Sequence, residues 1–177
     1  MKFCSNCGAP VVRRIPPGDT LPRFVCDACG IVHYQNPLVV VGSIPEHEGR
    51  ILLCRRAIEP RYGYWTLPAG FLENGETVAA GAVRETTEEA GASIELGQPF
   101  SLVSVPCVNQ VHLFFRARLQ HLDFKPGEET LEVALCDEAS IPWKDIAFRT
   151  VALTLRHWFA DRKAGRFTFH AEDLLPG

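Results

Sequence analysis

The apolar side chains of this sequence follow helical spacing most clearly near its end. Between residues 148 and 159 they recur at i, i+3, i+4 and i+7, which is the one-sided face of an amphipathic helix. We expect this helix to pack on the core through that face, with a dimer interface as the alternative. The face consists of Phe148, Val151, Ala152, Leu155, Trp158 and Phe159.

A second helix is predicted in the middle of the chain. Glu76 and Thr77 stand at its start, where a negative charge suits the helix dipole. Gly91 is expected to end it, because glycine readily adopts the left-handed conformation that follows many helices.

Shorter apolar runs predict strands. Residues 38–44 form a β-branched run that is typical of a buried strand, and residues 50–56 return after a turn at 46–49. In the tail, Phe167 and Phe169 are expected to pack as a strand or against a partner. Further strands are predicted at 100–105, 111–119 and 133–135, with a weaker candidate at 93–96.

Composition narrows the class of protein. The chain has 177 residues, 46% of them hydrophobic and 22% charged, which allows one sizeable core and a small appendage. The net charge of −3 gives no overall basic footprint, so nucleic acid is not an expected partner, although a local basic patch stays open. No apolar run approaches the roughly 20 residues of a membrane span, and the first ten residues lack a secretory pattern. We expect a cytoplasmic protein without a membrane partner.

Four of the seven cysteines form two CxxC pairs separated by 18 residues. Each pair makes a tight turn that aims two thiolates at one point, and two such turns complete a tetrahedral zinc site with Cys4, Cys7, Cys26 and Cys29 as ligands. Residues 1–36 are therefore predicted to be a zinc ribbon, with short strands at 23–25 and 31–34.

A closed four-thiolate site has no open position for chemistry, which favours a structural clip for the next domain or a dimer over a role in substrate or nucleic-acid contact. The other three cysteines are predicted to be buried, inert thiols. They are Cys54, Cys107 and Cys136.

Three carboxylates crowd one patch of the middle helix. Glu85, Glu88 and Glu89 are spaced three and four residues apart, so they are neighbours on the helix surface and repel one another. Such spacing alone is usually a solvated surface. A hard divalent cation such as Mg²⁺ would neutralise it with oxygen ligands.

The surrounding residues resemble the Nudix box at each of its fixed positions. The order is Gly70, five residues, Glu76, seven residues, Arg84-Glu85, two residues, Glu88-Glu89, one residue and Gly91. Two variable positions that the family usually fills with aliphatic residues hold Thr86 and Ala92 here. The resemblance implies a Nudix α/β/α sandwich with a mixed sheet over residues 37–177, preceded by the zinc ribbon, in an enzyme that cleaves phosphoric anhydride bonds.

A four-cysteine ribbon before a Nudix domain also resembles the NADH pyrophosphatase branch. That branch carries a SQPWPFPxS signature after the box, whereas residues 101–110 read SLVSVPCVNQ. Residues 34–77 instead resemble the plant chloroplast FAD/ADP-ribose pyrophosphatase type and its bacterial relatives. This resemblance covers nearly the whole chain.

The resemblance also implies a metal site for Mg²⁺ or Mn²⁺. Glu85 and Glu89 would be direct ligands, Glu88 would serve a second ion or its water shell, and the backbone carbonyl of Ala69 would also ligate. Arg84 is expected to hold Glu76 or one of the box glutamates in position by a charge-assisted bond. A further carboxylate from a late loop, Glu129 before Glu132, is expected as a ligand or as the general base; the base among Glu88, Glu89 and Glu129 stays open.

Substrate contacts are expected just before and within the box. Arg55, with Arg56 and Arg61 near it, could meet phosphates, and Tyr64 and Phe71 offer aromatic faces for a nucleobase. The leading substrates are small nucleotides, ADP-ribose or FAD, cleaved to release AMP.

Two alternatives stay open. One is cleavage of NADH or removal of an NAD cap from RNA, which the ribbon favours and the missing signature opposes. The other is a non-catalytic nucleotide sensor, a class that tends to lose the box glutamates that are present here. The ribbon and the final helix offer surfaces for a homodimer.

Overall fold

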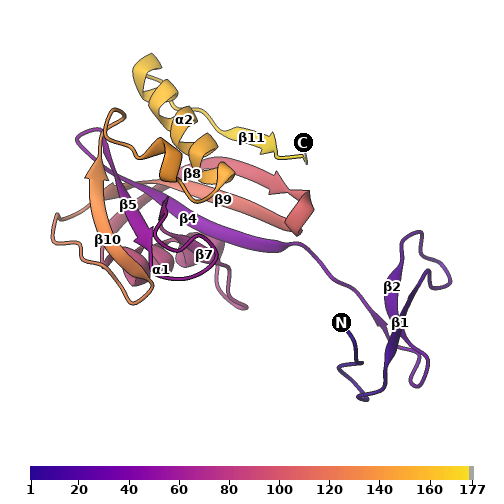
Figure 1. The fold of residues 1–177 in the computed structure, drawn as a ribbon. Helices are drawn as coiled ribbons and strands as arrows, with labels where there is room; N and C mark the ends of the chain where they lie inside the picture. The colour runs from indigo at the N-terminus through magenta and orange to yellow at the C-terminus, as the bar shows by residue number, and fades with distance from the viewer. Residues whose placement is uncertain (176–177) are drawn as a thin grey trace. The chain divides into compact units, whose positions relative to one another are not determined.

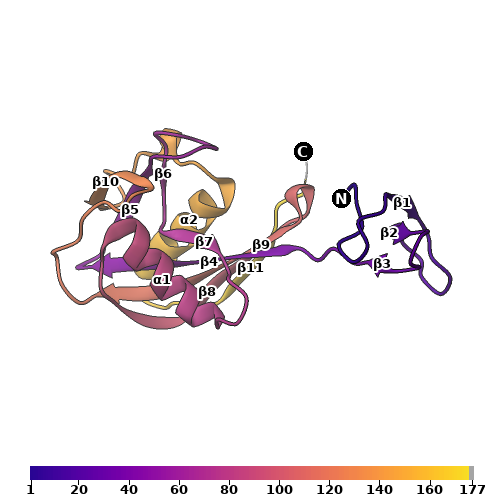
Figure 2. The ribbon, with the colours of Figure 1, turned by 90° about the horizontal axis from the view of Figure 1, so that it is seen from below.

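The structure, a computed structural model, describes residues 1–175; the last two positions of the predicted second domain, 176 and 177, lie outside it. The chain divides into two compact units, Met1–Asn36 and Pro37–Gly177, which are described separately. Figures 1 and 2 show the elements of each unit.

The first unit is a three-stranded antiparallel sheet in the order β1-β2-β3. Its strands are β1 (Val11–Arg14), β2 (Arg23–Cys26) and β3 (Val32–His33). The predicted hairpin is β2-β3, whereas β1 was not predicted, because two of its four residues are arginines and three of the four are exposed. Gly8 and Gly30 have φ angles of 74° and 75°, which only glycine adopts freely, and each ends one CxxC turn.

The second unit is built on one mixed sheet in the order β10-β5-β4-β9-β8-β11, in which β4–β9 and β8–β11 are the parallel pairs. Two helices, α1 (Val78–Ala90) and α2 (Arg149–Ala164), and two short 3-10 turns, η1 (Pro106–Val108) and η2 (Trp143–Asp145), complete it. The strands are β4 (Leu38–His47), β5 (Arg50–Arg56), β6 (Trp65–Thr66), β7 (Ala69–Phe71), β8 (Ile94–Val105), β9 (Gln110–Leu119), β10 (Thr130–Cys136) and β11 (His170–Asp173).

Alternation along β5 explains how the sheet binds a helix on each face. Ile51 and Leu53 pack in one apolar cluster with Trp158 of α2, whereas Leu52 lies in another cluster with Ala90 of α1. Because successive strand residues point to opposite faces, the two clusters lie on opposite sides of the sheet. Figures 1 and 2 show α1 and α2 on either side of the strands. The predicted α/β/α arrangement with a mixed sheet is confirmed.

Several strands are longer than their apolar runs. The segments predicted at 93–96 and 100–105 are one strand, β8, whose pairing with β9 shifts register on both sides of Pro99. A proline cannot donate a ladder hydrogen bond, so the strand continues only through this irregularity.

Two predictions about single residues are corrected. Cys107 is exposed in η1, because a proline and a left-handed Asn109 break the strand there. In the tail, Phe167 packs against the core, but Phe169 is 54% exposed and the strand begins only at His170, so the strand interpretation is wrong and packing against a partner stays a prediction.

Neither helix among residues 1–175 has the length and apolar character that crossing a membrane requires.

Thr77 and Gly91 define the ends of α1. The Thr77 hydroxyl accepts from the backbone N–H of Ala80, and Gly91 adopts the left-handed conformation at the other end. Within the helix, the fully buried Thr86 hydroxyl lies 2.6 Å from that of Ser43 on β4. The polar residue in this usually aliphatic position of the box is therefore paired.

Removing one hydroxyl of this pair is predicted to lower the free energy of unfolding more than removing both. Thr86→Val leaves the buried Ser43 hydroxyl unpaired and should lower the free energy of unfolding by about 1–3 kcal/mol. Adding Ser43→Ala should restore part of this loss, because no polar group then stays unpaired. Urea denaturation of the two single variants and the double variant measures the coupling. Strictly additive losses would contradict a direct bond between the two hydroxyls.

Candidate active site

One cavity of about 720 Å³ in the second unit receives side chains from six parts of the chain. They are β4, the stretch from the end of β5 to β6, the β7–α1 segment, β9, the loop before β10 and the start of α2. Its carboxylates belong to Glu73, Glu85, Glu88, Glu89, Glu128 and Glu129.

Arg84 fixes the acidic side of this cavity. Its Nε and Nη2 donate to the two carboxylate oxygens of Glu76, at 3.1 and 2.7 Å. Its Nη1 donates to Glu85 at 2.7 Å and to Glu88 at 3.0 Å, and Nη2 also donates to the carbonyl of Phe71 at 3.1 Å. One guanidinium therefore ties the loop before α1 to two glutamates of the helix, and these ion pairs raise the pKa of Arg84, so the cation is permanent.

Glu89 is the most buried of the box glutamates. The backbone N–H of Ala69 donates to its Oε2 at 3.0 Å, and burial raises its pKa to about 8, with Glu85 and Glu129 adding repulsion. Burial likewise raises the pKa of Glu85. A Cβ at Gly70 would collide with the Glu85 carboxylate, so the glycine lets the loop backbone lie against that group.

The loop before β10 adds a carboxylate from a distant part of the sequence. Lys125 and Gly127 donate their backbone N–H groups to the carbonyls of Ala90 and Glu89, at 2.8 and 3.0 Å. A Cβ at Gly127 would collide with the Glu88 carbonyl, so this loop docks closely on the end of α1. As a result Glu128 and Glu129 line the same cavity as the helix glutamates.

The donor chemistry of the oxygen-rich side of the cavity suits a hard divalent cation. Its donors are carboxylates, two of which hold raised pKa values through burial, and a bound cation would remove the repulsion among them. Glu85, Glu88, Glu89 and Glu129 would hold it. Ala69 also lines the cavity, and its carbonyl stays a predicted ligand.

Two residues that were expected to contact substrate lie elsewhere. Arg55 donates from Nε to the carbonyl of Gly63 at 2.9 Å and lies 3.6 Å from the Glu132 carboxylate. Tyr64 lies beneath the guanidinium of Arg61, at 5.4 Å, and lines a separate groove.

Of the neighbouring arginines expected near the phosphates, Arg56 lies at the cavity and Arg55 does not. Neighbouring strand residues project to opposite faces, and only Arg56 lines the cavity, with its guanidinium 5.1 Å from the ring of Phe148. Phe71 lines the cavity as expected. Glu132, the second choice for the late carboxylate, is outside it with Arg55.

No sequence pattern indicated the wall of the cavity that β9 contributes. His112, Gln110 and Phe114 line it, and His112 Nε2 lies 2.9 Å from the Gln110 side-chain oxygen. Burial lowers the pKa of His112, which favours the neutral form of the ring. Alternation along the strand gathers these three side chains on one face, but only the parallel β4–β9 pairing brings that face to the glutamates.

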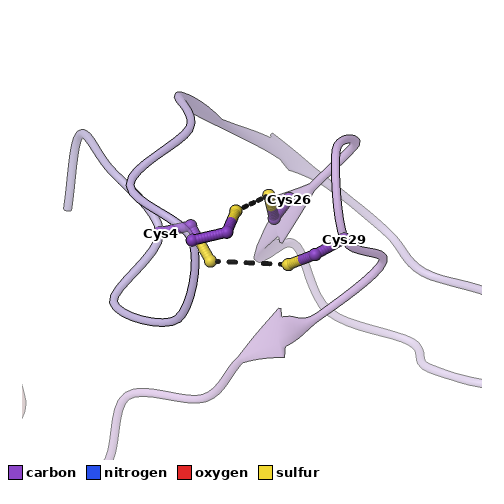
Figure 3. A group of neighbouring side chains, drawn as sticks. Cys4, Cys26 and Cys29 are labelled. Atoms are coloured by element: carbon purple, nitrogen blue, oxygen red, sulfur yellow. Dashed lines mark hydrogen bonds between the residues drawn. The ribbon is translucent and has the colours of Figure 1, made fainter.

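The four paired cysteines meet in the first unit. Their sulfur atoms all lie within 4.8 Å of one another, with Cys4–Cys29 at 3.7 Å and Cys7–Cys26 at 3.5 Å. Figure 3 shows the thiols of Cys4, Cys26 and Cys29 pointing toward one another. Four sulfurs at about 2.3 Å from a tetrahedral zinc are about 3.8 Å apart, so the arrangement fits structural zinc.

Comparison with known families accounts for both units. A model described as the NUDIX domain matches residues 36–161, and one described as Nudix N-terminal, a zinc ribbon, matches residues 2–35. The chain belongs to the Nudix family. The box residues gathered by Arg84 are thus part of a Nudix site.

Individual relatives show how far the likeness extends. A NUDIX hydrolase from Nitrosomonas europaea, of known crystal structure, has a TM-score of 0.95 and 53% identity over 98% of this chain and 99% of its own. The NAD-capped RNA hydrolase NudC of Stutzerimonas stutzeri (strain A1501) is 29% identical over 99% of this chain, which spans 60% of that relative's length. The ADP-ribose pyrophosphatase of Methanocaldococcus jannaschii is 31% identical over 62% of this chain and 67% of its own. The finer resemblance to the plant type is not confirmed by these relatives.

Glu89 makes the stability of the metal-free Nudix unit dependent on pH. The folded protein keeps the Glu89 proton up to a pKa of about 8, whereas the unfolded chain loses it near 4.5, so stability falls as pH rises through that window. The free energy of unfolding of Glu89→Gln, relative to that of the wild type, should rise by up to ~1.4 kcal/mol per pH unit between pH 5 and 8. Urea denaturation without added divalent cation measures this, with Glu132→Gln as a control. A pH-independent difference would contradict the buried proton.

The ribbon is predicted to bind about one zinc per chain. Cys4→Ser and Cys26→Ser each remove a ligand and should release the metal, while Cys107→Ser changes an exposed thiol outside the cluster and should retain it. Elemental analysis of the purified variants decides this. Full zinc content in the first two variants would rule out the four-thiolate site.

Proposed function

We propose that this Nudix protein hydrolyses the diphosphate of a nucleoside diphosphate that is linked to another moiety, in a reaction dependent on Mg²⁺ or Mn²⁺. The observation that carries the proposal is that carboxylates from α1 and from the loop before β10 share one cavity with the cation Arg56. When bound, a divalent cation neutralises charge on the diphosphate and activates water for attack.

Side chains of the cavity would bind the cation, position its ligands and accept a proton. Glu85, Glu88 and Glu89 would hold the cation, and Arg84 would keep Glu85 and Glu88 in position through its bonds of 2.7 and 3.0 Å. Glu129 faces them from the other loop and would serve as a further ligand or accept the proton of the attacking water.

The other side of the cavity suits the rest of a nucleotide. Arg56 would meet phosphate oxygens, and Phe71 and Phe148 offer aromatic faces for a nucleobase. The volume of about 720 Å³ lies within the usual range for sites that bind small molecules. ADP-ribose and FAD are the proposed substrates, with AMP as one product; the ADP-ribose pyrophosphatase of M. jannaschii is a relative consistent with this.

NADH or an NAD-capped RNA is the second candidate. The observation in its favour is the similarity to NAD-capped RNA hydrolase NudC over 99% of this chain, including the ribbon. The missing SQPWPFPxS signature in residues 101–110 opposes it.

A substrate panel ranks these candidates. The protein is incubated with ADP-ribose, FAD, NADH and an NAD-capped RNA, each with Mg²⁺ or Mn²⁺, and product release is resolved by chromatography. We expect ADP-ribose or FAD to be cleaved with the highest kcat/KM. A higher value for NADH or capped RNA would overturn the substrate assignment, and no turnover of any compound would overturn the enzymatic proposal.

Two matched substitutions test the site itself. Glu129→Gln and Glu89→Gln should each lower kcat by at least ~10²-fold, as loss of a ligand or of a general base does. Glu132 is three residues from Glu129 but outside the cavity, so the kcat of Glu132→Gln should stay within about twofold of the wild-type value. An unchanged rate in Glu129→Gln would remove this residue from the site.

A further inference from the structure

A second groove, of about 480 Å³, lies along the first half of α2. The loop after β5 supplies Arg61 and Tyr64, and η2 supplies Trp143 and Lys144. Figure 1 shows α2 close to the tail strand β11, after which Leu174 completes the groove. The groove meets the catalytic cavity at Phe148, which lines both.

The groove is strongly basic although the whole chain has a net charge of −3. Arg61, Lys144, Arg149 and Arg156 line it, and no Asp or Glu of the described residues does so. None of these four cations forms an ion pair within residues 1–175, in contrast to Arg55, Arg84 or Arg118. Asp145 is the acidic residue of η2, and it does not line the groove.

The fold does not need these charges where they stand. Arg149 is the first residue of α2, whose first turn has no acidic residue, and a cation is unfavourable at the positive end of a helix. Lys144 is exposed and makes no ion pair among the described residues. Four cations without ion-pair partners among the described residues form a surface that suits an anionic ligand from outside the chain.

Two aromatic rings lie next to cations of the groove. The guanidinium of Arg61 lies 5.4 Å from the ring of Tyr64, and that of Arg156 lies 5.7 Å from the ring of Trp143. Both rings are only partly buried. Aromatic faces and guanidinium planes are the surfaces on which unpaired bases stack, while cations beside them follow the phosphates.

We propose that this groove binds single-stranded nucleic acid, with phosphates on the four cations and bases stacked at Tyr64 and Trp143. Inorganic polyphosphate could pair with the cations but has no bases to stack on the rings. A duplex could pair with the cations, but its bases are paired with each other and cannot stack on the rings. The proposal is independent of catalysis, because it concerns binding beside the catalytic cavity, and binding is measured without turnover.

The test is fluorescence anisotropy of a labelled single strand of about ten nucleotides, with the full chain and without added Mg²⁺ or Mn²⁺. We expect a Kd of about 1–100 µM at low salt, and a plot of log K against log salt with a slope of about −2 to −3, as four neutralised phosphates require. A matched duplex or polyphosphate of equal charge should bind at least ~5-fold more weakly. Equal affinity for polyphosphate would mean that the groove is a general anion site, and this would overturn the proposal. A Kd above about 1 mM for the single strand would also overturn it.

Paired variants locate the binding. Arg156→Gln should weaken binding several-fold and reduce the slope by about 0.7, whereas Arg166→Gln, an exposed cation beyond the other end of α2, should change neither. Tyr64→Leu should weaken binding at least ~5-fold.

The control for the ring is Tyr34→Leu, because Tyr34 of the ribbon also lies under a guanidinium, that of Arg23 at 5.0 Å. A larger loss in Tyr34→Leu than in Tyr64→Leu would move the binding to the ribbon and overturn the assignment to the groove.

Discussion

The bonds of one guanidinium group hold the catalytic side of this protein together. Arg84 donates to three carboxylates and one backbone carbonyl, and the carboxylates belong to Glu76, Glu85 and Glu88. Without that cation, glutamates three and four residues apart on α1 would repel one another at the surface. With it, the loop before the helix and the exposed face of the helix form one ionic network, and the loop backbone is fixed against the helix.

Backbone contacts complete what this ionic network begins. Gly70 lets the loop approach the Glu85 carboxylate, and Gly127 lets the loop before β10 dock on the carbonyls at the end of α1. Each close approach excludes water from the carboxylates, which is why the pKa of Glu89 rises to about 8. The site therefore holds repulsion and desolvation that a bound divalent cation would relieve. In this way the packing of two loops would be coupled to the affinity for metal.

The sheet and α2 give the cavity and the groove different characters. Phe148, directly before α2, lies in both, with Arg56 on the side of the carboxylates and with Arg149 beside it in the groove. Acidic groups gather on one side of this ring and unpaired cations on the other. A diphosphate in the cavity would need a metal to offset the carboxylates, whereas phosphates in the groove would not. The same short segment thus separates an acidic cavity from a basic groove.

Local rules were enough to predict much of the fold. The one-sided apolar face of α2, the ends of α1 at Thr77 and Gly91, the β4–β5 hairpin and the CxxC pairs all depend on contacts between near neighbours in the sequence. These contacts follow from helical and strand periodicity, which a single sequence displays. Prediction was poorer where a proline or a polar run interrupted the pattern, as in β8 and at Cys107.

The box residues themselves were predicted from the sequence through their resemblance to the Nudix box, while the spacing of Glu85, Glu88 and Glu89 placed them as neighbours on one helix. What only the tertiary structure decided is which distant residues meet them. Glu129 joins through the docking of its loop on α1, and His112 through the parallel pairing of β9 with β4. The choice of Arg56 over Arg55, and the clustering of four scattered cations in one groove, depend on strand phase and long-range packing. Spacing along the sequence determines which residues are neighbours on one helix or strand. Which helices and strands pack against each other is determined only by the long-range contacts of the folded chain.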